Sequence, residues 1–183
     1  MHYESKETHE GVYAIRVWNE HKTQLTVSSY GAAITSVLFA NKAATHSEEM
    51  TLFDPETALE NRAYFGVTVG RVANRIANGT MKIEGINYSL AKNNGANCLH
   101  GGNIGFDKKI WEYRIIPKEM EVSVEFSTLS VDGEENFPGN LRVLVTISLD
   151  IEDNIKIEYS ATTDKTTPVN LTNHTYCEYS FYL

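Results

Sequence analysis

The stretch LRVLVTISLDI, residues 141–151, alternates apolar and polar side chains along its length. The apolar residues that share one face of an extended chain are Leu141, Val143, Val145, Ile147, Leu149 and Ile151. The other face carries Arg142, Thr146, Ser148 and Asp150, and Leu144 interrupts the pattern. A period of two is the spacing of a β-strand that is buried on one side. The stretch therefore predicts a long, half-buried strand.

Similar alternation extends outward from this strand. Residues 155–161 (IKIEYSA) predict a partner strand, with a hairpin turn at Asp153-Asn154. Residues 80–90 (TMKIEGINYSL) predict a second hairpin, which turns at Glu84-Gly85. Further strands are expected in VSVEFSTL (122–129) and on both sides of Gly31 in TQLTVSSYGAAITSVLF (23–39).

One short helix is expected from Asp54 to about Asn61, because Asp54-Pro55-Glu56 combines an N-cap, a proline at the first position and an acidic first turn. Many strands separated by Gly, Asn and Pro turns indicate an all-β sandwich or barrel. A length of 183 residues is sufficient for one domain, expected to span residues 1–183.

The net charge of -8 argues against nucleic acid and anionic membrane surfaces as partners, because both attract clustered Lys and Arg. No apolar run is long enough to cross a bilayer, and the polar N-terminus does not resemble a signal peptide. Cys98 and Cys177 do not form a disulfide framework. A cytoplasmic location is the expectation, and the sequence says nothing about oligomeric state.

The first functional candidate is FGVTVGRVANRIANGT, residues 65–80, in which Arg71, Asn74 and Arg75 lie close together. Guanidinium and amide groups supply the hydrogen bonds that bind sugar hydroxyls. Ordinary ion pairs offer another explanation, in which the two arginines brace a loop against acidic residues. Residue types alone leave both interpretations open.

The second candidate is NNGANCLHGGNIGFDKKIW, residues 93–111. His100 precedes two glycines, which allow a tight turn and close approach of a ligand. Asn93, Asn94 and Asn97 could add hydrogen bonds, and Phe106 and Trp111 could supply a flat apolar surface for a sugar ring. The alternative is a glycine-rich turn in which His100 has only a structural role.

The third candidate is NLTNHTY, residues 170–176. His174 carries the side chain whose ordinary pKa suits proton transfer near neutral pH. The alternative is that His174 has only a structural role and forms a hydrogen bond across a sheet. The spacing of His100, His174 and the two cysteines does not fit a zinc site, and no nucleotide-binding glycine motif is present, so neither a metal nor an organic cofactor is expected.

Four blocks occur together in a characteristic order: GRVANRIANG, LHGGNIGFDKKIW, DGEENFPGNL and NLTNHTY. In these blocks the chain resembles the aldose 1-epimerase family, the galactose mutarotases. The resemblance implies an antiparallel β-sandwich of the galactose mutarotase-like type. It also implies an isomerase without a cofactor, which interconverts the α and β anomers of aldohexoses such as galactose and glucose.

The resemblance also assigns roles to single residues. It makes His174 the acid that protonates the ring oxygen, and His100 a second catalytic histidine that binds and polarises the substrate. Asn74, Arg75 and Arg71 are carried over as substrate-binding candidates. The DGEENFPGN block is expected to form a structural or rim loop, with Asn136 where the family usually has glycine.

Family members continue well beyond the NHTY motif, and their general base, a glutamate, comes from that later region. We therefore expect a truncated chain with an incomplete sandwich, and weak or absent activity. Glu134, Glu135 and Glu178 are poorly placed to replace the base. The alternative function is a non-catalytic sugar-binding remnant, or an association partner of a full-length relative.

Overall fold

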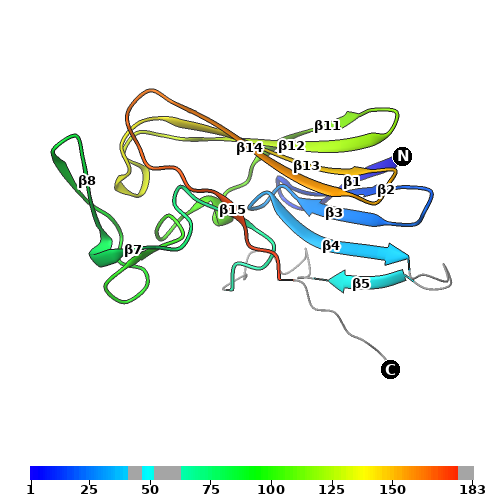
Figure 1. Cartoon of the computed structure of the whole chain (residues 1–183), viewed down its shortest axis with the longest axis horizontal. Coiled ribbons are helices and arrows are strands. Elements are labelled where there is room, and N and C mark those ends of the chain that lie inside the picture. The colour runs from blue at the N-terminus through cyan, green and yellow to red at the C-terminus, as the bar shows by residue number, and fades with distance from the viewer. Residues whose placement is uncertain (41–46, 52–62, 177–183) are drawn as a thin grey trace.

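The computed structural model describes residues 1–40, 47–51 and 63–176, and its two main sheets are antiparallel. The first sheet has the order β1-β2-β3-β4-β5, with bounds His2–His9, Val12–Trp18, Gln24–Ser28, Ala33–Ala40 and Ser47–Thr51. The second has the order β11-β12-β13-β14, with bounds Glu112–Pro117, Glu121–Ser130, Leu141–Asp150 and Ile155–Thr163. One sheet lies above the other (Figure 1), which confirms the predicted β-sandwich. The helix expected from Asp54 lies outside the described residues.

Strand β13 contains the alternating stretch that begins at Leu141, and it lies inside the second sheet between β12 and β14. Five of its predicted inward residues are at most 1% exposed: Leu141, Val143, Val145, Ile147 and Leu149. Ile151 lies just beyond the end of the strand and is half-buried. The period-two pattern thus correctly identified the buried face.

Both predicted hairpins are confirmed. At the β13–β14 turn, the Asp150 carboxylate accepts hydrogen bonds from the backbone N–H groups of Glu152 and Asn154. Strand β8 (Thr80–Ile83) pairs with β9 (Ile86–Ser89) through a two-residue turn, in which Glu84 and Gly85 have φ angles of 49° and 84°. Two consecutive positive φ angles match the twist of an antiparallel hairpin.

The main core fills the space between the two sheets. It combines inward residues of β2, β3 and β4 with those of β12 and β13. Phe106 and Trp111 complete it from the connection before β11, with ring centroids 5.6 Å apart in an edge-to-face arrangement. The Trp111 indole N–H donates to the Phe106 carbonyl oxygen at 3.1 Å, so its one polar atom is satisfied inside the core.

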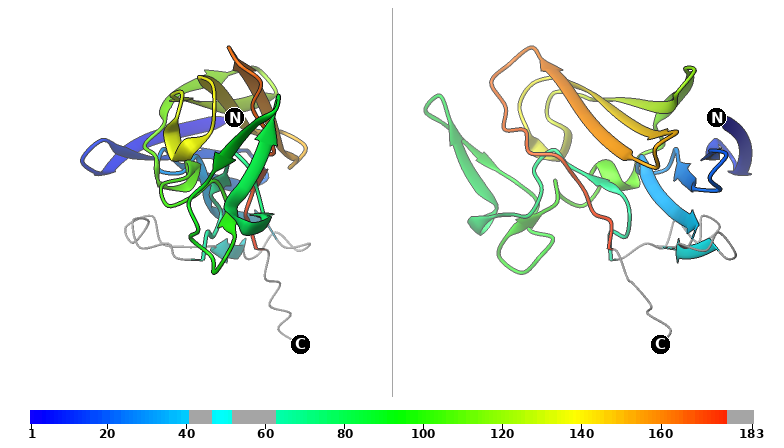
Figure 2. Two further views of the ribbon diagram at one scale, coloured as in Figure 1. Left: turned by 90° about the vertical axis from the view of Figure 1, so that its left-hand side faces the viewer. Right: turned by 45° about the vertical axis from the view of Figure 1, so that its right-hand side comes forward.

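In the part of the chain that the structure describes, three two-stranded sheets lie outside the sandwich. They pair β6 (Thr68–Val69) with β15 (Thr172–Asn173), β7 (Arg75–Ile76) with β10 (Cys98–Leu99), and β8 with β9. Strands β7 and β8 lie at the left-hand end of the view in Figure 1, whereas β15 lies near its middle, and Figure 2 shows this region from two further directions. Short 3-10 turns within the described residues include those at Ala77–Gly79, Phe106–Lys108 and Glu134–Asn136.

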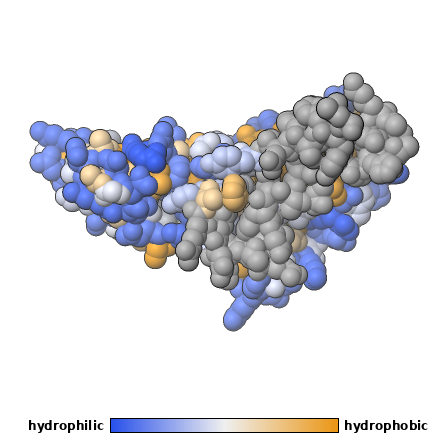
Figure 3. Space-filling view, turned by 90° about the horizontal axis from the view of Figure 1, so that it is seen from below, coloured by the Kyte–Doolittle hydropathy of each residue, from blue (hydrophilic) through white to orange (hydrophobic). Residues whose placement is uncertain are grey.

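The surface of this end is largely hydrophilic in the view from below (Figure 3). In the part of the chain that the structure describes, no helix is long and apolar enough to cross a membrane.

The position of β13 in the core generates a stability prediction. Ile147 is fully buried, whereas Ile86 in the β8–β9 hairpin is 58% exposed. Ile147→Val should lower the free energy of unfolding by about 0.5–1.5 kcal/mol, because it leaves a small cavity. The same change at Ile86 should stay within about 0.5 kcal/mol. Urea denaturation followed by fluorescence measures both, and equal losses would contradict the assignment of β13 to the core.

Candidate active site

The pairing of β6 with β15 determines the position of His174. The backbone N–H of His174 donates to the Val67 carbonyl oxygen at 2.8 Å, and the Gly66 N–H donates to the His174 carbonyl oxygen at 3.0 Å. The Asn173 side-chain amide adds a hydrogen bond to the Gly66 carbonyl oxygen at 2.7 Å. These bonds hold the backbone at His174 in place and do not involve its imidazole nitrogens.

His100 directly follows β10, and its backbone is bonded to the β7 side of that small sheet. Its N–H donates to the Asn74 carbonyl oxygen at 3.0 Å, and the Asn74 N–H donates to Nδ1 of the His100 ring at 3.1 Å. Both residues have positive φ angles, 51° for His100 and 63° for Asn74. Left-handed backbone outside glycine is uncommon and gathers at functional sites.

The hydrogen bond at Nδ1 defines the chemistry of His100. Since Nδ1 accepts a backbone N–H, the proton of the neutral ring lies on Nε2. The pKa of His100 is lowered to about 4, chiefly by burial, and electrostatic interaction with His174 and Arg75 contributes in the same direction. At neutral pH His100 is therefore an uncharged ring whose Nε2–H can donate to a ligand oxygen.

The two histidines lie together. Their ring centroids are 5.0 Å apart with the planes at 90°, although the residues come from distant parts of the chain. Tyr64 contacts both rings, at centroid distances of 4.7 Å to His100 and 5.9 Å to His174. Tyr176 lies 5.1 Å from His174. We call Tyr64, His100, His174 and Tyr176 the histidine cluster.

Sequence reasoning missed the aromatic part of this cluster. Tyr64 directly precedes the first functional candidate, and Phe65 is the first residue of that candidate. The Phe65 ring lies edge-on to Tyr176, with ring centroids 5.3 Å apart. Their signal was two adjacent aromatic residues before Gly66, outside any alternating stretch. Conversely, Phe106 and Trp111 are each 1% exposed within the main core. The flat apolar surface expected from those two residues is thus unavailable to a ligand.

Asn74 and Arg75 are exposed beside His100. Nε of Arg75 donates to the Asn94 side-chain oxygen at 3.0 Å, and Nη1 donates to that of Asn74 at 3.3 Å. Two amides therefore orient the guanidinium group. Its charge acts on His100, as the lowered pKa of that ring indicates. These two candidates and the two histidines form one site.

Arg71 is held elsewhere. Its side chain is 2% exposed, and burial lowers its pKa. Nε donates to the Ser130 hydroxyl, and the two terminal nitrogens donate to the acceptors that surround them: the carbonyl oxygens of Ser130, Val131, Pro138 and Gly139 and the hydroxyl of Thr167. The guanidinium thus has acceptors for all of its N–H groups within the protein. These contacts fit the bracing explanation, with backbone carbonyls in place of acidic side chains.

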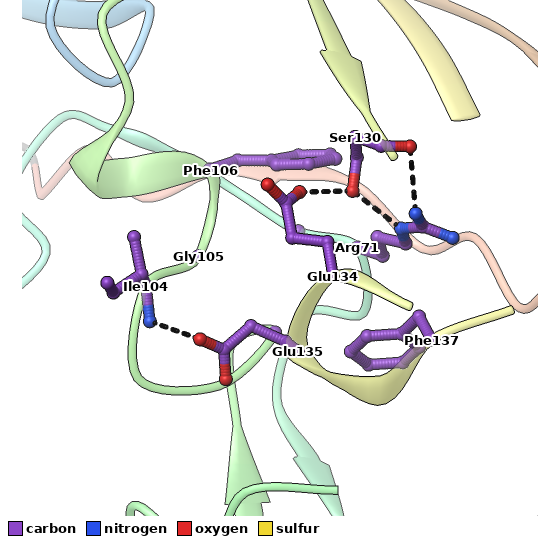
Figure 4. Close-up of a pocket in the computed structure, with 10 residues that line it drawn as sticks. Arg71, Ile104, Gly105, Phe106, Ser130, Glu134, Glu135 and Phe137 are labelled. Carbon is purple, nitrogen blue, oxygen red and sulfur yellow. Dashed lines mark hydrogen bonds between the residues drawn. The ribbon is translucent and has the colours of Figure 1, made fainter. Parts of the chain in front are cut away.

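The glutamates of the DGEENFPGN block are also engaged (Figure 4). The Glu134 carboxylate accepts hydrogen bonds from Nζ of Lys109 at 2.5 and 2.7 Å and from the Ser130 hydroxyl. The Glu135 carboxylate accepts the backbone N–H groups of Asn103 and Ile104 at 2.9 and 3.0 Å. Neither carboxylate is therefore available as a general base in this arrangement.

Potential metal ligands do not gather in residues 1–40, 47–51 and 63–176. No group of three His, Cys, Asp or Glu side chains within these ranges could hold a metal ion. The chemistry that this part of the chain offers is proton transfer and hydrogen bonding by two imidazoles, a guanidinium and an amide.

Comparison with known proteins supports the motif analysis. A family model described as Aldose 1-epimerase matches residues 13–181. Galactose mutarotase from Bos taurus is 45% identical over 154 residues, which are 84% of this chain and 44% of that protein.

Solved structures are similar over almost the whole chain. The crystal structure of galactose 1-epimerase from Lactobacillus acidophilus has a TM-score of 0.84 and 30% identity, covering 96% of this chain and 52% of that one. An aldose epimerase homologue from C. elegans gives a TM-score of 0.82 and 29% identity, covering 96% and 51%. The chain spans about half the length of these relatives. The resemblance seen in the four sequence blocks is confirmed, and the chain belongs to the aldose 1-epimerase family.

Proposed function

We propose that the histidine cluster binds an aldohexose and interconverts its α and β anomers by acid–base ring opening. The observation that carries this proposal is the 5.0 Å separation of the two imidazole rings. At that separation, both rings can reach a single sugar. Several relatives are named galactose mutarotase, so galactose is the first aldohexose to test.

In this proposal His174 donates a proton to the ring oxygen of the sugar. The bond between C1 and the ring oxygen then breaks, and the C1 hydroxyl loses its proton to become the aldehyde oxygen. Rotation about the C1–C2 bond followed by reversal of these steps gives the other anomer. An acid and a base are both required, since proton gain and proton loss occur on opposite sides of one bond.

The other members of the site bind the sugar. His100 stays neutral because its pKa is lowered to about 4, and its Nε2–H donates to a sugar oxygen. Asn74 and Arg75 are exposed next to it and supply further donors to hydroxyl groups. Tyr64 and Tyr176 present aromatic rings to the C–H face of the sugar.

Turnover by this chain is proposed to be weak. Glu134 and Glu135 are bonded to other groups, so we assign the role of base to solvent water. A positioned general base contributes a factor of roughly 10²–10⁴, and water does not supply it. The alternative is a sugar-binding chain without catalysis, or one that associates with a full-length relative. A cytoplasmic location stays a prediction.

Polarimetry on freshly dissolved α-D-galactose tests the catalytic proposal. We expect the purified chain to accelerate mutarotation modestly over the spontaneous rate, because His174 supplies an acid. His174→Ala should return the rate to the spontaneous value. Calorimetric titration with galactose should show binding in both proteins and weaker binding in His100→Gln.

The outcomes separate the two functions. Binding without acceleration by the wild type would favour the sugar-binding alternative. A folded chain that neither binds galactose nor accelerates its mutarotation would overturn the proposal. Acceleration that persists in His174→Ala would remove His174 from the role of acid.

The two arginines of the first block should respond differently to the same change. Arg71→Lys should lower the free energy of unfolding by about 1–3 kcal/mol, because lysine leaves buried carbonyl oxygens without donors. Arg75→Lys should change stability by less than about 0.5 kcal/mol, since this side chain is exposed, and should weaken galactose binding. Urea unfolding and calorimetry measure the two effects. If Arg75→Lys lowered stability and Arg71→Lys instead weakened galactose binding, Arg75 would have the structural role and Arg71 the binding role.

A further inference from the structure

Glu135 lies against the turn that follows His100 (Figure 4). One carboxylate oxygen accepts the N–H of Asn103 at 2.9 Å, and the other accepts the N–H of Ile104 at 3.0 Å. Glu135 lies more than thirty residues further along the chain from these partners. The contact therefore joins the DGEENFPGN block to the turn that carries His100.

The turn after His100 has an unusual backbone. His100, Gly101 and Gly102 have consecutive positive φ angles of 51°, 92° and 117°. For a residue other than glycine, such a conformation costs roughly 1–3 kcal/mol, and it persists only where the surroundings hold it. The geometry of His100 thus depends on contacts that restrain the turn.

The restraint by Glu135 is close and direct. A Cβ atom placed on Gly102 would lie 2.2 Å from a carboxylate oxygen of Glu135, so the absence of a side chain there lets the carboxylate approach. A second side chain also binds this turn: the Asn93 amide donates to the carbonyl oxygens of Leu99 and Gly102 at 2.9 and 2.7 Å. The turn is held by these two side chains.

Glu135 is itself fixed to the scaffold. The neighbouring Asn136 donates from its side-chain amide to the Ser89 carbonyl oxygen at 2.9 Å, and Phe137 is 1% exposed. Arg71 binds carbonyl oxygens at both ends of the loop, including those of Ser130 and Gly139. The carboxylate is thus part of a braced loop.

We propose that Glu135 is a positioning residue for His100, holding the 101–104 turn so that the imidazole faces the sugar and stays shielded from water. This inference rests on the proposed function only in that His100 contacts the sugar. Its central measurement does not require activity.

Removal of the Glu135 carboxylate can change the pKa of His100 in two ways, and these have opposite directions. Electrostatic interaction with His174 and with the Arg75 guanidinium lowers the pKa of His100, and the Tyr64 ring lies against the imidazole. Simple removal of a negative charge at Glu135 would lower the pKa of His100 further. Loosening of the turn admits water and raises this pKa toward the ordinary value, so the two effects have opposite directions.

The test is an NMR titration of the histidine Cε1–H signals in the full chain, assigned with His100→Gln and His174→Gln. In the wild type, the His100 signal should remain that of a neutral ring down to about pH 5, because its pKa is about 4. In Glu135→Ala, the midpoint should move above pH 5 toward 6.5. Glu135→Gln retains one acceptor oxygen, so its midpoint should lie between the two.

Glu134→Gln is the matched control. It removes the same charge from the adjacent residue, but its partners are Lys109 and Ser130 instead of the turn. It should leave the titration of His100 unchanged even if it lowers stability. Thermal unfolding confirms that each variant is folded before titration.

Calorimetry with galactose provides the second readout. Where the wild type binds, Glu135→Ala should weaken galactose binding several-fold, and Glu135→Gln should weaken it less. An unchanged or lowered His100 midpoint in folded Glu135→Ala would overturn the positioning role. If the wild type does not bind galactose but the His100 midpoint is still raised in Glu135→Ala, the positioning role is retained and the proposed function is rejected.

Discussion

The buried guanidinium of Arg71 is the interaction on which the rest of this structure depends. It lies in the segment between β6 and β7 and donates to carbonyl oxygens at Ser130, Val131, Pro138 and Gly139. A buried charge is tolerated only where hydrogen bonds surround it. Here four of the six acceptors are backbone carbonyl oxygens, and the other two are the hydroxyls of Ser130 and Thr167. The side chain therefore joins the small sheets at one end of the molecule to the loop between β12 and β13.

The histidine cluster lies among the short strands that Arg71 connects to the loop between β12 and β13. Three segments that are distant in sequence supply Tyr64, His100 and His174, and each is held by only a two-residue strand or a turn beside one. Such short pairings contribute little stability by themselves. Their arrangement is maintained by contacts with the large sandwich and the braced loop, which includes the carboxylate that contacts the turn after His100.

Environment gives the two histidines different properties. His100 accepts a backbone N–H at Nδ1, is half-buried and has a lowered pKa, all of which favour a neutral donor. His174 is also half-buried, but its hydrogen bonds to Val67 and Gly66 use its backbone, and its ring contacts Tyr64, His100 and the exposed Tyr176. Two titratable groups in unlike surroundings are the usual basis for dividing acid and binding roles within one site. The carboxylates of the neighbouring loop are occupied in structural bonds, which is why the base is the weak point of the proposed reaction.

The sequence by itself determined the family, the two hairpins and the strands β3, β4, β8, β9, β12, β13 and β14, whereas β1, β2 and β11 were not predicted. Alternation in residues 141–151 and the turn at Glu84-Gly85 depend on neighbours along the chain, so local pattern was sufficient. Only the tertiary structure separated Arg71 from Arg75, buried Phe106 and Trp111, and brought Tyr64 to the histidines. The burial and orientation of a side chain depend on residues that are far away in sequence. The local spacing of Arg71 and Arg75 therefore does not indicate which of the two is buried against such residues.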